Sequence, residues 1–197
     1  SVTDSITRGG YWAKGPYVNE LEQRLEQHLN VDHALVVNSG TTALTAALRG
    51  SGVGEGDEVI VPSFTFIATA NAVRLTGAEP VFADIETQTY GLSPSDVESK
   101  ITDATAAILP VHCYGTSCQI QELTQIAEDH GALLIEDAAE VLGAEYQGKK
   151  LGTFGDAAAL SFCQNKITPT GEGGAVVTDD EEIAKQVKLY RSHGRAS

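Results

Sequence analysis

Two kinds of apolar pattern alternate along the chain. Short, mostly apolar runs predict buried strands, and longer segments in which apolar residues recur at three- and four-residue steps predict amphipathic helices. The strands are expected at residues 34–37, 58–62, 79–85, 105–111, 132–137, 157–162 and 175–178. The helices are expected at residues 18–29, 42–50, 69–76, 120–130 and 179–193, with one more opening at 93–96.

This alternation predicts an α/β fold. Because several strands are apolar throughout, both of their faces must be covered, and we expect a mainly parallel sheet with helices on both faces. Residues 143–151 are expected to form a polar excursion or hairpin around Gln147 and Gly148. Since the sequence shows no internal repeat, linker or low-complexity segment, residues 1–197 are interpreted as one domain.

Net charge narrows the classes of partner. The sequence holds 13 lysine and arginine residues against 27 aspartate and glutamate residues, a formal net charge of −14. Such a charge repels nucleic acids and anionic membranes, so neither is an expected partner. The acidic residues are dispersed rather than gathered in a tail, which leads to the hypothesis of a protein adapted to high salt.

The remaining composition favours a cytoplasmic protein without a metal site. No apolar run reaches membrane-spanning length, and no charged leader precedes an apolar stretch. The three cysteines, Cys113, Cys118 and Cys163, form no Cys-x-x-Cys pair and are expected to be reduced thiols. The five histidines are scattered without the spacing of metal ligands.

The N-terminal segment 9–16 is rich in turn residues and holds the only tryptophan, Trp12. This side chain either covers a site or anchors the start of the chain in the core. The sequence lacks methionine, even at its first position, so Ser1 is not expected to be the natural start.

Lys166 is the first candidate for chemistry. It stands between the apolar run 157–162 and the glycine cluster 171–174, where it can lie at the edge of a buried strand. Partial desolvation there would favour the neutral amine and make it a nucleophile able to form a Schiff base. The alternative is a solvated lysine in a surface turn.

A second candidate is the turn at residues 38–42, Asn-Ser-Gly-Thr-Thr, between a strand and a helix. A helix that begins directly after a strand leaves free N–H groups at the positive end of its dipole, which suits a phosphate group. The same residues could equally be no more than a helix cap.

Carboxylates and aromatic side chains follow two other strands. Glu136 and Asp137 end an apolar strand, at the edge where ligands gather in open parallel sheets. Phe64 and Phe66 follow the strand 58–62. One of them could face a cleft, although a core position for both is the default expectation.

The order of these pieces resembles the DegT/DnrJ/EryC1/StrS family of sugar aminotransferases, a branch of the fold type I pyridoxal-phosphate enzymes. The resemblance covers almost the whole chain, and the order and spacing of its short motifs make it specific. These motifs are Gly15-Pro16, Asn38-Ser-Gly-Thr41, Pro62 with Thr65-Phe66, Val111-His112 with Tyr114-Gly115, Glu136-Asp-Ala-Ala139, Gly152-Thr-Phe-Gly-Asp156, Ser161-Phe162, and Lys166 with Gly171-Glu-Gly-Gly174.

The resemblance implies two catalytic residues. Lys166 would form the Schiff base with pyridoxal 5′-phosphate and move the proton between the amino donor and the cofactor. Asp137 would pair with the pyridine nitrogen, so that the ring can accept electrons. For Glu136 we expect a structural role.

The resemblance also implies a set of cofactor contacts. These are Thr41, Thr42 and Ser161 with the phosphate, Phe66 with the face of the ring, and Glu140 with the 3′-oxygen. An exposed loop carboxylate is the alternative for Glu140.

The implied reaction is a transamination in two halves. An amino acid, with L-glutamate as the expected donor, would aminate the cofactor, which would then aminate the keto carbon of a nucleotide-linked 4-keto-6-deoxy sugar. Residues 163–171 look similar to members of the perosamine type. The family implies a homodimer, and it continues beyond the stretch matched by residues 191–195, so the chain is expected to be the large cofactor-binding domain without the C-terminal domain.

Other interpretations stay open at this stage. Some family members dehydrate sugars and carry histidine in place of the lysine, so Lys166 favours amino transfer. A cysteine desulfurase or aldolase-like relative would share the cofactor site, but a desulfurase needs a catalytic cysteine on a mobile loop, for which Cys118 is a poor candidate. A non-catalytic relative or fragment would retain the fold alone.

Overall fold

The computed structural model describes residues 2–7 and 15–195. Trp12 therefore lies outside the described residues. The strands are β1 (His33–Val37), β2 (Glu58–Pro62), β3 (Glu79–Ala83), β4 (Thr105–Ile108), β5 (Leu133–Asp137), β6 (Glu145–Tyr146), β7 (Lys149–Lys150), β8 (Ala157–Ser161) and β9 (Gly174–Thr178). The helices are α1 (Val2–Thr7), α2 (Pro16–Leu29), α3 (Gly40–Gly50), α4 (Ala68–Thr76), α5 (Pro94–Lys100), the 3₁₀ turn η2 (Cys113–Gly115), α6 (Ile120–His130) and α7 (Glu181–Arg191).

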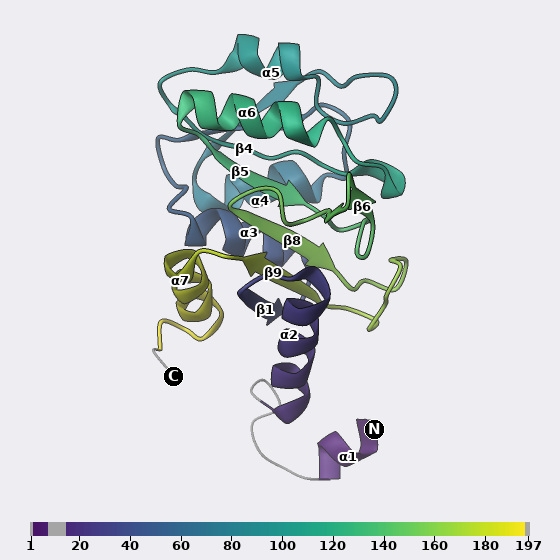
Figure 1. Ribbon diagram of the computed structural model, residues 1–197. Coiled ribbons are helices and arrows are strands. Elements are labelled where there is room, and N and C mark those ends of the chain that lie inside the picture. The colour runs from purple at the N-terminus through teal and green to yellow at the C-terminus, as the bar shows by residue number, and fades with distance from the viewer. Residues whose placement is uncertain (1, 8–14, 196–197) are drawn as a thin grey trace.

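The larger sheet has seven strands in the order β1-β9-β8-β5-β4-β2-β3 (Figure 1). Strands β3, β2, β4, β5 and β8 run parallel to their neighbours in that series, whereas β9 runs antiparallel to both β1 and β8. The prediction of a mainly parallel sheet is confirmed. Strand β9 is reversed because residues 162–173 return from β8 without a crossover helix, which a parallel neighbour usually requires.

Helices cover both faces of the sheet, as predicted. Val59 and Val61 of β2 pack in a core cluster with α3, α4 and α7. Ile60, between them, points the other way and packs with α5 and α6. Helix α2 covers the same side further along, where Leu25 and Leu29 pack on β1, β8 and β9. This burial on both faces explains why the strands are apolar throughout.

The excursion at residues 143–151 is a hairpin made of β6 and β7. Gln147 and Gly148 have φ values of 51° and 82°, the pair of left-handed residues that a tight hairpin turn requires. The hairpin prediction is confirmed.

Two strands end two or more residues earlier than predicted. Strand β3 stops at Ala83, and Ile85 forms only an isolated bridge with Leu92. Strand β4 stops at Ile108, shortly before Pro110, which has no N–H to donate to a neighbouring strand. In the described part of the chain, no helix is long and apolar enough to cross a membrane.

Candidate active site

The predicted phosphate turn lies at the start of α3. Ser39 caps this helix, because its Oγ accepts a hydrogen bond from the Thr42 N–H at 3.1 Å and lies 3.0 Å from Thr42 Oγ1. Thr41 and Thr42 are both half-buried in the first turn. Of the backbone N–H groups in this turn, the Ser39 side chain accepts only that of Thr42. The other N–H groups of the first turn have no acceptor within the helix, so a helix cap and an anion site are compatible here.

Ser161, at the end of β8, lies against the start of this helix. A Cβ added to Gly40 would lie 2.8 Å from Ser161 Cβ and 3.0 Å from its Oγ. Gly174 closes the other side, because a Cβ there would lie 2.5 Å from the Ser39 carbonyl oxygen. Glycines at positions 40 and 174 thus let Ser161 lie beside the turn that carries Thr41 and Thr42.

Asp137 ends β5, the strand next to β8, and its side chain is buried. Thr69 Oγ1 donates to Asp137 Oδ2 at 3.0 Å, and the Ala139 N–H donates to Oδ1 at 3.3 Å. Burial raises the pKa of the Asp137 carboxyl, although these two hydrogen bonds and the positive charge of Lys166 act to lower it. A desolvated carboxyl of this kind gains strongly from a protonated partner.

Lys166 lies on the loop that follows β8. Its Nζ lies 3.0 Å from Glu140 Oε1, and its side chain is only 18% exposed. The alternative of a solvated surface lysine is therefore wrong. The ion pair also means that the amine is held by a carboxylate in this structure, where the sequence led us to expect a desolvated neutral amine.

Glu140 is the residue that joins this lysine to a second loop. Its other oxygen, Oε2, accepts a hydrogen bond from the Tyr114 N–H at 2.7 Å. Although partial burial acts to raise the pKa of Glu140, the hydrogen bonds from Lys166 and from Tyr114 outweigh it, and the pKa is lowered. Glu140 is thus a loop carboxylate with a 38% exposed side chain that bonds both Lys166 and the Tyr114 N–H.

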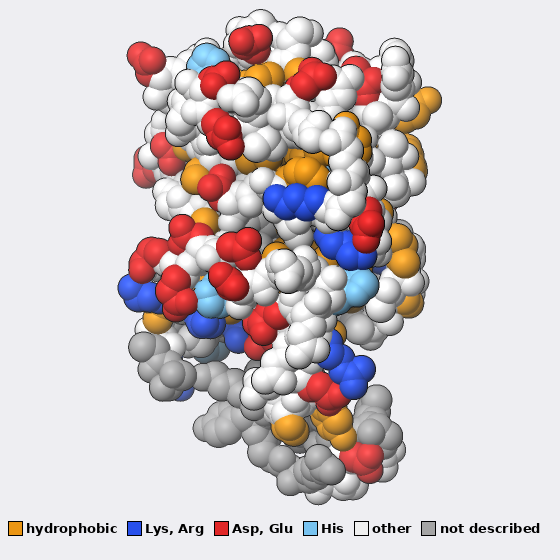
Figure 2. Space-filling model, viewed as in Figure 1, with side chains coloured by type: hydrophobic (Ala, Val, Ile, Leu, Met, Phe, Trp, Pro, Cys, Tyr) orange, Lys and Arg blue, Asp and Glu red, His pale blue; other side chains and the backbone are white. Residues whose placement is uncertain are grey.

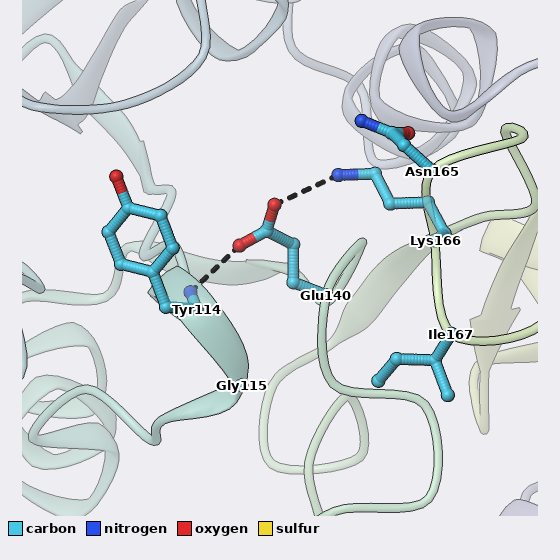
Figure 3. A pocket seen from close by; sticks show the side chains of 6 residues that line it. All are labelled: Tyr114, Gly115, Glu140, Asn165, Lys166 and Ile167. Carbon is cyan, nitrogen blue, oxygen red and sulfur yellow. Dashed lines mark hydrogen bonds and ion pairs between the residues drawn. The ribbon is translucent and has the colours of Figure 1, made fainter.

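Lys166 and Glu140 line a hollow of about 230 Å³. Figure 3 shows the Glu140 side chain between the Lys166 amine and the Tyr114 backbone. The other lining residues are Gly115, Asn165 and Ile167. Sequence reasoning found Lys166 and Glu140 but gave Tyr114 no role beyond its place in a family motif.

The default expectation for Phe64 and Phe66 is wrong. Phe64 is 44% exposed and Phe66 is 77% exposed, so neither belongs to the core. Both lie beyond the end of β2, where the pleat no longer turns alternate side chains inward. Phe64 packs near Tyr90 and Tyr114, with ring centroids 6.0 and 6.4 Å apart, and Phe66 is not among the residues that line the Lys166 hollow.

Glu136 has the structural role that we expected. Its fully buried carboxylate accepts hydrogen bonds from the N–H groups of Gly152, Phe154 and Gly155 at 2.9, 2.6 and 2.9 Å. It also lies 2.9 Å from Nε2 of the buried His112. Glu136 thus braces the loop after the hairpin directly behind Asp137.

The tautomer of His112 follows from its second nitrogen. His112 Nδ1 accepts a hydrogen bond from the Cys118 N–H at 3.3 Å, so the ring proton is on Nε2 and points at Glu136. Sequence reasoning counted His112 among the scattered histidines and gave it no role beyond its place in a family motif. Only its spatial position next to β5 reveals this partnership.

One edge of the sheet therefore carries most of the predicted residues. Asp137 is in register with Ala159 of β8, so the ends of β5 and β8 lie side by side. Ser161 follows on β8 beside the start of α3, and Glu140 and Lys166 meet across the loops above. Within residues 2–7 and 15–195, no group of three or more histidine, cysteine, aspartate or glutamate side chains could hold a metal ion.

Sequence comparison assigns the family. Residues 1–197 match the DegT/DnrJ/EryC1/StrS aminotransferase family. The chain belongs to this family. The resemblance that the sequence motifs indicated is confirmed.

Individual relatives agree with the family assignment. The GDP-perosamine synthase of Caulobacter vibrioides is 47% identical over 180 residues, which cover 91% of this chain and 48% of that protein. Streptomyces venezuelae DesV, solved in complex with a ketimine intermediate, is 44% identical with a TM-score of 0.90, covering 93% of this chain and 50% of DesV.

A further solved structure is the PLP-form of the putative sugar aminotransferase Spr1654 from Streptococcus pneumoniae. It is 32% identical with a TM-score of 0.89, covering 95% of this chain and 54% of Spr1654. These likenesses confirm the predicted fold. The chain spans about half the length of the relatives that it matches.

Proposed function

We propose that the protein is the cofactor-binding part of a pyridoxal 5′-phosphate-dependent aminotransferase acting on a nucleotide-linked 4-keto-6-deoxy sugar. One observation carries the proposal. A sequestered amine, that of Lys166, and a buried carboxyl with a raised pKa, that of Asp137, lie close enough at one sheet edge for the charge of Lys166 to act on Asp137.

The described residues fit the cofactor at each of its polar groups. Its phosphate would bind at the start of α3, to Thr41 and Thr42 and to the Ser161 hydroxyl, which the glycine at position 40 allows to approach. Its protonated ring nitrogen would bind Asp137. Nothing else in the described site provides a comparable buried carboxyl, since the carboxylate of Glu136 is fully engaged by four donors.

When bound, pyridoxal phosphate supplies an aldehyde for covalent attachment and a ring that accepts electrons. Lys166 would provide the amine for that attachment and would carry the proton between carbon atoms as general acid and base. Asp137 would hold the proton on the ring nitrogen. Burial makes this contact strong, because the protonated ring nitrogen would offset the desolvation free energy of the buried Asp137 carboxylate.

Two further contacts belong to the proposal. Glu140 would meet the cofactor's 3′-oxygen from its position beside Lys166. Phe66 would cover the face of the ring; its exposed position after β2 leaves the side chain free to do so.

The substrate class is proposed from the relatives. The Caulobacter vibrioides relative is a GDP-perosamine synthase, a name that specifies a sugar nucleotide as the product. The family as a whole is one of aminotransferases. We further propose L-glutamate as the amino donor, a homodimer as the assembly and the cytoplasm as the location. The desulfurase alternative is disfavoured, because burial raises the pKa of the Cys118 thiol and keeps it protonated.

An amino-transfer assay tests the proposal. The protein, extended by the rest of its natural sequence if it has one, is incubated with L-glutamate and a panel of GDP-, UDP- and dTDP-linked 4-keto-6-deoxy sugars. We expect an amino sugar from at least one member of the panel, together with 2-oxoglutarate in equal amount. If none of these sugars is aminated and none yields 2-oxoglutarate, the substrate class is contradicted. A dehydrated sugar formed without 2-oxoglutarate would indicate the dehydratase alternative.

A further inference from the structure

The two oxygens of Glu140 bind groups on two different loops. Oε1 lies 3.0 Å from the Lys166 amine, on the loop after β8, and Oε2 accepts the Tyr114 N–H at 2.7 Å, in η2 (Figure 3). Both loops border the same hollow. The carboxylate of Glu140 thus fastens one wall of the hollow to the other.

The loop held by Oε2 has an uncommon backbone. Tyr114 has φ 55° and ψ 27°, a left-handed conformation that large side chains rarely adopt, and Gly115 follows with φ 84°. Such conformations persist where surrounding contacts enforce them, and they cluster at functional sites. The hydrogen bond from the Tyr114 N–H to Glu140 is a contact of this kind.

Both partners of Glu140 are donors only, since an ammonium and a backbone N–H offer no acceptor. A carboxylate can serve both at once. A glutamine has one carbonyl oxygen and one NH₂ group, so at this position it could accept from only one of them. Bonding both donors at once, one on each oxygen, therefore takes a carboxylate.

We infer that Glu140 is a positioning residue that restrains the Lys166 amine by holding it against the Tyr114 turn. This inference rests on the proposed function in so far as Lys166 is the attachment residue. It goes further in assigning Glu140 the task of placing the amine. The amine must leave Glu140 before it can attack any electrophile.

Other ionisable groups near the pair do not replace Glu140. The charge of Lys166 acts on Asp137, but the oxygens of Asp137 bond Thr69 and the Ala139 N–H. The Cys113 thiol is also close, and burial together with the charges of Glu140 and Asp137 raises its pKa to about 11, so it stays uncharged. Loss of the Glu140 charge therefore leaves the amine without its direct anionic partner.

Competitive labelling of the cofactor-free protein with acetic anhydride tests this inference. The acetylation rate of Lys166 is measured by mass spectrometry relative to that of Lys185, an exposed lysine on α7. We expect E140Q to raise this ratio about two- to fivefold at pH 7.5, the size of effect expected when a partly exposed ion pair is lost. E140D, which keeps the charge, is expected to react more slowly than E140Q.

The matched control is E145Q, which removes the carboxylate from another ion pair, Glu145 with Lys150, whose lysine is 27% exposed. It should speed labelling of Lys150 and leave Lys166 unchanged. Should E140Q fail to fold by circular dichroism, the comparison is made in the Y114G background, where glycine adopts the left-handed turn without strain.

An unchanged Lys166 ratio in folded E140Q would overturn the inference, as would an equal rise in E145Q. The measurement needs no cofactor. If the Lys166 acetylation ratio rises in E140Q as expected while neither wild type nor any variant binds pyridoxal phosphate, the inference stands and the proposed function fails.

Discussion

At the scale of single residues, Asp137 makes the stability of the cofactor-free protein depend on pH. Burial raises its pKa in the folded state above that of the unfolded chain. The folded state therefore binds its proton more tightly, so this group's contribution is fully present below the unfolded pKa and is lost as pH rises through the folded pKa. The cost of ionising it falls on the folded state alone.

The substitution D137N should remove this cost. An asparagine can accept from the Ala139 N–H with its oxygen and donate to the Thr69 hydroxyl with its NH₂ group, so the local bonding is kept. We expect D137N to raise the free energy of unfolding by about 1 kcal/mol at pH 8 and to leave it unchanged at pH 4. Amino transfer should fall at least about 100-fold.

Urea denaturation of both proteins at the two pH values measures the stability effect. A D137N protein less stable than wild type at pH 8 would show that the ionised carboxylate is not costly and would remove a main support of the proposed site.

Glu136, one position earlier, predicts the opposite result. Its carboxylate accepts three backbone N–H bonds and lies against the ring of His112, and a glutamine cannot accept all of them. E136Q should therefore lower the free energy of unfolding by about 3 kcal/mol. E145Q, at an exposed ion pair, should change it by less than about 0.5 kcal/mol in the same denaturation experiment.

Sequence could not fully separate the two acids. Glu136 and Asp137 are consecutive at the end of one apolar strand, and only the family resemblance divided their roles. The donors that engage Glu136 come from residues 152–155 and from His112, and no local pattern brings these segments together. The same holds for Glu140, whose partners are 26 residues away on either side.

At the scale of elements, the contact between α3 and β8 depends on a missing side chain. A Cβ at Gly40 would lie 2.8 Å from Ser161 Cβ, and both residues are half-buried where α3 begins and β8 ends. We expect G40A to lower the free energy of unfolding by about 1–3 kcal/mol because the helix start and the strand end must move apart. Affinity for pyridoxal phosphate should fall with it, since Ser161 is displaced from the phosphate turn.

The control is G54A, because a Cβ at Gly54 meets nothing within 4 Å. Chemical denaturation and a pyridoxal phosphate titration of both variants give the comparison. Equal cofactor affinity in G40A and G54A would argue against a phosphate site at the start of α3.

Element order was predictable because each strand and helix has its own apolar period, but strand direction was not. Strand β9 reads as one more apolar run, yet it runs antiparallel to both neighbours. Its direction follows from the short connection of residues 162–173, which holds Lys166 and leads from β8 directly back into β9. Exposed aromatics were missed for a related reason: Phe64 and Phe66 continue the strand pattern in sequence after the strand has ended in space.

At the scale of the whole molecule, net charge is the dominant feature. The formal charge is −14, and acidic side chains are spread over the face shown in Figure 2 rather than gathered in one patch. Their mutual repulsion is screened by salt. We expect the melting temperature to rise by several degrees between low salt and molar potassium chloride, measured by circular dichroism. A melting temperature that stays level or falls would contradict adaptation to high salt.

We propose that a single amine of the protein, that of Lys166, bonds pyridoxal phosphate. The most direct measurement treats wild type, K166A and the control K185A with pyridoxal phosphate, reduces each with borohydride and maps the modified lysine by mass spectrometry. We expect a phosphopyridoxyl group on Lys166 in wild type and in K185A, with no comparable modification in K166A. Equal modification of the three proteins, or a wild-type label on lysines other than Lys166, would contradict it.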